Sequence, residues 1–163
     1  MHKSLLILLF NPILCFSQQK KTDSAYINEI VRAIDNIGKV NSKSFTKDKI
    51  VGKKKFIENW QHFDNHNLSR IVIDYTIDST AYSEKYYFKD GSLIYAYESI
   101  ILFYPDLGID QGTMWAGDFY FSKGKLIDHV TLGHGKSEKD DWDPEKEILQ
   151  RLKKRKMELQ LLK

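Results

Sequence analysis

The sequence predicts one α+β domain, made of an N-terminal helix, an antiparallel β-meander of about five or six strands, and a C-terminal amphipathic helix. Three observations predict this class. Apolar residues recur at spacings of three and four near both ends of the chain. The middle of the chain alternates apolar and polar residues or is continuously apolar, as strands are. A nine-residue segment with a turn signal also occurs twice.

The first helix is expected within residues 22–38. Its apolar face consists of Ile27, Ile30, Val31, Ile34 and Ile37. Thr22, Asp23 or Ser24 can cap its start, and Gly38 can end it. The basic and polar segment that follows, residues 39–55, is expected to be a connection with room for a short strand around Phe45.

Two strands stand out in the middle of the chain. Residues 70–78, "RIVIDYTID", place Ile71 and Ile73 on one side and Arg70 and Asp74 on the other, which predicts a strand with one wet face. Residues 93–104, "LIYAYESIILFY", are apolar on both faces and rich in aromatic and β-branched residues. This segment is expected to be a long central strand.

The repeated segment predicts hairpins. "YYFKDGSLI" at Tyr86–Ile94 and "FYFSKGKLI" at Phe119–Ile127 share five of nine positions, and each places Gly in the turn between a Phe and a Leu. A third, altered copy runs from Phe63 to Leu68, with His66 in place of Gly. We expect three β-hairpins in which the flanking Phe and Leu pair across the strands.

These segments resemble the YwqK-like and MORN-variant hairpin repeats in their pattern of an aromatic residue, two spacers, Gly, a spacer and Leu. The resemblance covers Tyr86–Ile94 and Phe119–Ile127, with a poor third copy. It implies a meandering sheet and an interaction role, and it assigns no catalytic residue to this chain.

The first seventeen residues, "MHKSLLILLFNPILCFS", have the layout of a secretory signal peptide, with a basic start, a short apolar stretch and small residues near Ser17. We expect cleavage after Ser17, a single domain over residues 18–163, and an exported protein of the bacterial periplasm or the outside. Pro12 and Leu14 fit a lipobox poorly, which favours cleavage over lipidation of Cys15. The mature chain then has no cysteine for a disulfide, a thiolate metal site or a nucleophile.

The net charge and the motifs of the sequence limit the classes of function to consider. A net charge of +3 does not indicate nucleic-acid binding. No cofactor motif, nucleophile elbow or metal-ligand spacing of high specificity occurs. The leading hypothesis is a non-catalytic binding module for an unidentified protein or small molecule. Its expected contact residues are Trp115 and Met114, in a loop predicted over residues 104–118, and an aromatic sheet face with Tyr86, Tyr95 and Tyr97.

Two alternatives stay open. A small acid–base or metal-dependent enzyme would use His129, His134 and Asp118, provided that the three side chains converge. A peripheral membrane protein would use the basic amphipathic helix predicted over residues 144–163, which Asp143 caps. The same helix can instead pack on the domain with a solvated basic face.

Overall fold

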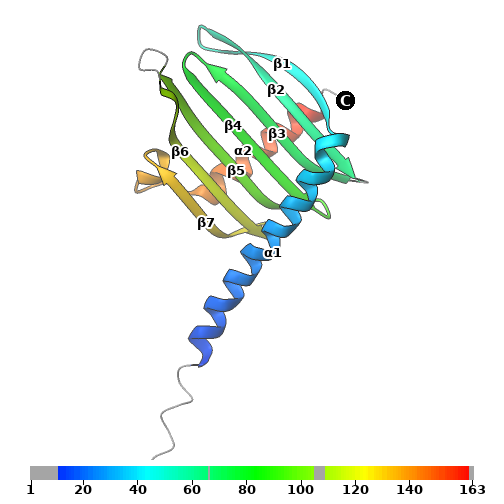
Figure 1. Cartoon of the computed structure of the whole chain (residues 1–163), viewed down its shortest axis with the longest axis vertical. Coiled ribbons are helices and arrows are strands. Elements are labelled where there is room, and N and C mark those ends of the chain that lie inside the picture. Colours follow the sequence, from blue (N-terminus) through cyan, green and yellow to red (C-terminus); the bar gives the residue numbers. More distant parts are fainter. Residues whose placement is uncertain (1–10, 66, 105–108, 162–163) are drawn as a thin grey trace, which may run out of the picture.

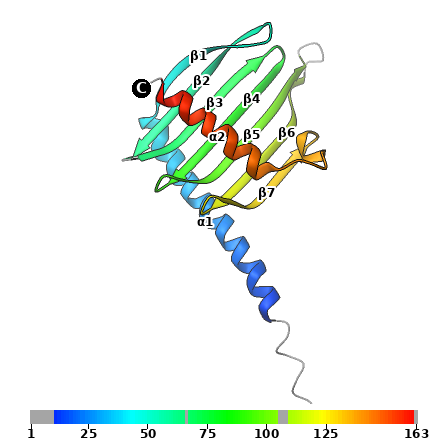
Figure 2. The ribbon, with the colours of Figure 1, turned by 180° about the vertical axis from the view of Figure 1, so that it is seen from behind.

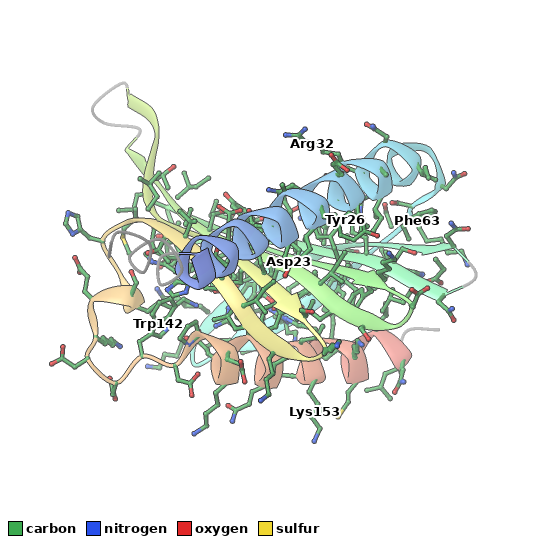
Figure 3. The ribbon with its side chains drawn as sticks, turned by 90° about the horizontal axis from the view of Figure 1, so that it is seen from below. Asp23, Tyr26, Arg32, Phe63, Trp142 and Lys153 are labelled. Carbon is green, nitrogen blue, oxygen red and sulfur yellow. The ribbon has the colours of Figure 1, made fainter. Side chains whose placement is uncertain are left out.

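The protein is a sheet covered by one helix on each face. The computed structural model describes residues 11–65, 67–104 and 109–161. Helix α1 (Asn11–Asn41) lies on one face, and helix α2 (Pro144–Gln160) lies on the other (Figures 1 and 2). Viewed from below, the three layers are separate (Figure 3). Among the described residues, no helix combines the length and the apolar character needed to cross a membrane.

The sheet is an antiparallel meander, as the sequence predicts. Its seven strands are β1 (Lys43–Val51), β2 (Lys54–Asn65), β3 (Asn67–Ile77), β4 (Thr80–Lys89), β5 (Ser92–Tyr104), β6 (Ile109–Ser122) and β7 (Lys125–Gly133). They lie side by side in chain order. The strand count exceeds the predicted five or six. A short 3₁₀ helix, Lys136–Glu138, lies between β7 and α2.

The repeated segments form the hairpins β4–β5 and β6–β7. In the turn between β4 and β5, both central residues have positive φ, 51° at Asp90 and 77° at Gly91, which suits the tight type I′ turn. The predicted pairs are present, since Phe88 lies opposite Leu93 and Phe121 lies opposite Leu126. This prediction is confirmed for both copies.

The third copy is also a hairpin, because β2 pairs with β3 directly on either side of its turn. Its register differs from the prediction, since Asp64 and not Phe63 lies opposite Leu68. A register shift between Phe63 and Asp64 separates the two pairings. His66 lies outside the described residues.

The apolar core lies between the sheet and α2. It includes Trp60, Ile71, Ile73, Tyr86, Trp115 and Phe119 from the sheet, with Ile148, Leu152 and Leu159 from α2. The Asp143 carboxylate accepts a hydrogen bond from the Lys146 amide at 3.0 Å, which confirms the predicted N-cap. The apolar stripe of α2 therefore packs on the domain, whereas a membrane anchor would need that stripe to face lipid.

Helix α1 is longer than predicted. It continues from Asn11 through Asp23 and Ser24, so neither residue caps its start, and it ends at Asn41 beyond Gly38. Gly38 serves close packing, because a Cβ there would lie 3.0 Å from Cζ of Arg70. At this position the close contact with Arg70 outweighs the low helix propensity of glycine.

The loop predicted over residues 104–118 is mostly strand. β6 begins at Ile109, so Trp115 lies in the sheet, where its side chain is 1% exposed. β6 is paired along its length with β5, a partner that local glycines and acids do not reveal. The prediction of a recognition loop is therefore wrong for the described part of this segment.

Candidate functional site

The face of the sheet toward α1 carries three rows of side chains that strand register brings together. The covered row consists of Arg70, Tyr87, Tyr95, Tyr120 and Asp128. The middle row consists of Gln61, Val72, Lys85, Tyr97, Asp118 and Val130. The outer row consists of Asn59, Asp74, Ser83, Ser99, Ala116 and Leu132.

Helix α1 is anchored on the covered row. The Asp35 carboxylate accepts hydrogen bonds from Arg70 Nη1 at 2.7 Å and from the Tyr87 hydroxyl at 2.8 Å. Arg70 Nη2 donates to Ser42 Oγ at 2.8 Å. Burial, and next the hydrogen bond to Asp35, raise the pKa of Tyr87 well above its ordinary value. Arg70 was predicted on a wet face, but it is buried because α1 covers it.

Beside this anchor lies an open hollow of about 600 Å³. Its walls come from the flank of α1 and from strands β2, β3 and β4. The lining residues are Arg32, Asp35, Asn36, Gln61, Arg70, Val72, Asp74, Ser83, Lys85 and Tyr87. Its volume is that of a small-molecule site, although its lining is more polar than most such sites.

In the hollow, the acidic groups have hydrogen-bond partners, whereas two of the basic groups have no carboxylate partner among the described residues. Asp35 is engaged by the α1 anchor, and Asp74 accepts a hydrogen bond from Ser83 Oγ at 2.6 Å. Lys85 Nζ lies 5.2 Å from the centre of the Tyr97 ring, a cation–π contact. Within the described ranges, neither Lys85 nor Arg32 has a carboxylate partner. The hollow therefore keeps unpaired positive charge.

The opposite face buries three glutamates beneath α2. Arg155 of α2 bonds two of them, with Nη1 donating to Glu58 at 2.9 Å and Nη2 donating to Glu84 at 2.6 Å. Burial by itself would lower the pKa of Arg155, but the hydrogen bond and charge of Glu84, with the charge of Glu58, raise it. Its guanidinium also lies over the Trp60 ring, 5.5 Å from the ring centre.

The third buried glutamate, Glu98, pairs with Arg151 and Lys136. Glu147 of α2 pairs with the same two cations, at 2.7 Å from Lys136 Nζ. These ion pairs line a second cavity of about 420 Å³ together with Tyr75 and other residues. Because its buried charges already bond one another, this face fastens α2 to the sheet.

Trp115 and Tyr86 lie in the core and not on a contact surface. The Trp115 indole donates to Ser137 Oγ at 3.1 Å and packs against Phe119. Tyr86 is fully buried on the α2 face, where its hydroxyl donates to Glu84 at 3.0 Å. Burial, with the nearby charge of Glu84, raises the pKa of Tyr86 well above its usual range.

Tyr95 and Tyr97 lie on the face opposite Tyr86, so the three tyrosines do not share one surface. The Tyr95 hydroxyl donates to the Asp118 carboxylate, and its ring lies among other tyrosines of the covered row. Tyr97 is half-buried beside Lys85. Met114 is 39% exposed on β6. Of the predicted contact residues, Met114 is exposed, Tyr95 and Tyr97 are half-buried, and Trp115 and Tyr86 are buried.

The residues of the enzyme alternative do not converge. Asp118 lies on the α1 face with Tyr95, whereas the His129 ring stacks on Phe119 on the α2 face. The exposed His134 side chain bonds Glu138 at 2.6 Å. In the part of the chain that the structure describes, no group of three histidine, cysteine or acidic side chains could hold a metal ion.

The residues that sequence reasoning missed are the cations of the hollow. Lys85 precedes the repeated segment and gave no signal alone, since a single lysine on a strand is usually solvated. Arg70 was placed correctly on the strand face with Asp74, but its partner Asp35 lies on α1, 35 residues away. Only the tertiary arrangement brings the three cations together.

Comparison of the chain with protein-family models, with curated proteins and with solved structures finds no match. The likeness of Tyr86–Ile94 and Phe119–Ile127 to YwqK-like and MORN-variant repeats therefore stays a prediction, although both segments do form hairpins.

Proposed function

We propose that this protein is an exported, non-catalytic binding module that holds its ligand in the hollow beside α1. One observation carries the proposal. The buried charged groups on the α2 face form ion pairs with one another, whereas Lys85 and Arg32 at the hollow have no carboxylate partner among the described residues. Unpaired charge in a concave surface of this volume is what a polar ligand can use.

The chemistry of the lining favours binding over catalysis. Histidine and cysteine are missing from the residues that line the hollow. The Asp35 carboxylate is held by Arg70 and Tyr87, and the pKa of Tyr87 is raised away from neutrality. General acids and bases work best with a pKa near the operating pH, so these groups suit a structural anchor.

Export is part of the proposal and rests on the pattern of residues 1–17. Residues 11–17 belong to the first turns of α1, and the described side-chain contacts from α1 to the sheet begin at Ser24, which bonds Asp128 at 3.2 Å. Cleavage after Ser17 would therefore leave these contacts intact. The ligand would then be met in the periplasm or outside the cell.

Native mass spectrometry of the protein, purified gently from its own host, tests the proposal. We expect a bound molecule in addition to the chain mass. Gln61→Trp places a large neutral side chain in the hollow and should abolish this adduct. Ile57→Trp is the matched control, because Ile57 lies on the same strand and is exposed, but lies outside the hollow.

Retention of the adduct in Gln61→Trp would move the site elsewhere on the molecule. Loss of the adduct in both variants would indicate a general effect of the new tryptophan. A bare chain in the wild type, with no ligand captured from a host extract, would contradict the binding role.

A further inference from the structure

We infer that the ligand of the hollow is a small hydrophilic molecule with a carboxylate or phosphate group, which Lys85 binds at the floor and Arg32 attracts at the rim. This inference rests on the proposed function and adds the chemical class of the ligand. It follows from the charge, the local geometry and the lining of the hollow.

The charge of the hollow is positive. Three cations and two carboxylates line it. Asp35 is neutralised by Arg70 at 2.7 Å, which leaves one carboxylate, Asp74, and two cations, Lys85 and Arg32, along the lining. The excess of one positive charge favours a ligand of opposite sign, because an ionised partner makes the stronger hydrogen bonds.

Lys85 is positioned to present its ammonium group to a ligand. It occupies the middle row between Val72 and Tyr97, with Gln61 next along the row. Its stem is half-buried, and its Nζ stands over the Tyr97 ring. A cation–π contact uses the ring face and leaves ammonium hydrogens for an anion. Gln61, on the other side of Val72 in the same row, adds an amide to the lining.

Arg70 is a fixed part of the floor whose charge is balanced by Asp35. Its side chain is 8% exposed, held by Asp35 and Ser42, and covered by α1 at Gly38. Arg70 Nε is buried without a hydrogen-bond partner in the described structure. Because this atom is closed off from solvent, Arg70 shapes the floor and leaves direct ligand contact to Lys85.

The lining also limits the rest of the ligand. Val72 is the one aliphatic residue among the lining side chains, and the other residues are polar, charged or tyrosine. An acyl chain would gain little from such a surface, because the hydrophobic effect scales with buried apolar area. Arg32 rises from the outer flank of α1 in Figure 3, at the rim and not on the floor, where it can attract a charged ligand before binding.

Chemical-shift titrations test the ligand class. The isotopically labelled protein, purified from its host, is titrated with acetate, with inorganic phosphate and with neutral glycerol, at constant pH and ionic strength. We expect amide shifts at Gln61, Lys85 and Tyr97 with an anion and none with glycerol. The stronger of the two anions identifies carboxylate or phosphate as the preferred group.

Variants assign the effect to the hollow. Lys85→Gln removes one charged hydrogen bond and should weaken anion binding about tenfold. Lys153→Gln is the matched control, because it removes the same charge from an exposed residue of α2 that points away from the sheet (Figure 3). Binding to this control should equal binding to the wild type.

Three outcomes would overturn the inference: no anion shifts at the hollow, equal shifts with glycerol, or equal weakening by Lys85→Gln and Lys153→Gln. The proposed function is judged separately. If Gln61→Trp abolishes the native adduct while anions fail to bind, the hollow is the site and only the ligand class is wrong.

Discussion

The two faces of this sheet use similar residues for opposite purposes. Under α2, Arg155 lies between two buried glutamates, and each charge is satisfied by a neighbour. Under α1, charge pairing is concentrated at Asp35 and Arg70, and the rows beyond it remain open beside a hollow. The difference teaches that a polar side chain in a sheet is structural when its partner is already present, and available for binding when that partner is missing.

Removing Arg155 should have the largest effect on stability. Arg155→Met leaves Glu84 buried without its cation and Glu58 with only Lys49 at 3.8 Å, at an expected cost of about 3–5 kcal/mol in the free energy of unfolding. Urea denaturation at neutral pH measures the loss. Lys153→Met on the exposed side of α2 is the control and should change stability by less than about 0.5 kcal/mol. Equal effects of the two variants would refute the structural role of the buried cluster.

Replacing a buried glycine by alanine should have the second-largest effect on stability, and the loss should be greater at Gly117 on the α2 face than at Gly38 of α1. In Gly117→Ala the new Cβ would lie 2.6 Å from Cζ of Phe119, a fully buried ring, so we expect a loss of about 1–3 kcal/mol. In Gly38→Ala the nearest atom is the Arg70 guanidinium at 3.0 Å, and helix propensity offsets the contact by about 1 kcal/mol. Thermal unfolding of both variants measures the two losses. A lower melting temperature for Gly38→Ala than for Gly117→Ala would contradict this order.

The α1 anchor should be weaker than the α2 cluster. Arg70→Met breaks the bonds to Asp35 and Ser42, but Asp35 is 38% exposed and can be solvated by water. We expect a loss of about 1–2 kcal/mol in the free energy of unfolding. Denaturation in urea, compared directly with Arg155→Met, checks the difference. A loss as large as that of Arg155→Met would mean that both faces are equally closed.

Acid should loosen the α2 face, with the smallest effect of the four. Burial would raise the pKa values of Glu147 and Glu158, but bonds from Lys136 to Glu147, and from Lys49 and Arg155 to Glu158, lower them below 4.5. A lowered pKa in the folded state stabilises the fold above pH 4.5, and this contribution is lost as the pH falls through the lowered values. Urea midpoints measured across this range should fall less steeply in Glu147→Gln than in the wild type.

Local signals in the sequence are sufficient for the two hairpins whose turns contain glycine, but not for the register of the third. Positive φ at Asp90 and Gly91 is a property of two adjacent residues, and the Phe–Leu pairs follow directly from the turn. The meander class follows from several such turns in succession. The sequence predicts Gly38 as the end of the helix because a glycine at a helix end and a glycine beneath a side chain look alike in sequence.

The predicted aromatic face with Tyr86, Tyr95 and Tyr97 does not exist because one extra residue shifts the register between β4 and β5. If β4 and β5 had continued in the register of Phe88 and Leu93, Tyr95 would lie opposite Tyr86. The register shift after that pair instead places Tyr95 opposite Tyr87, which turns Tyr95 and Tyr97 to the α1 face. The same shift sets Tyr97 opposite Lys85, so the bulge positions a pair at the hollow that no local pattern reveals.

The strictly sequential order of the sheet has a consequence for how the chain assembles. Each strand pairs with its neighbours in sequence, so the sheet can grow hairpin by hairpin through short loop closures, which favours fast folding. The contact between Glu58 and Arg155 spans 97 positions and cannot form until the last helix arrives. Docking of α2 is therefore the step that removes Glu58 and Glu84 from water, and the growing sheet keeps these acids hydrated until its final helix closes over them.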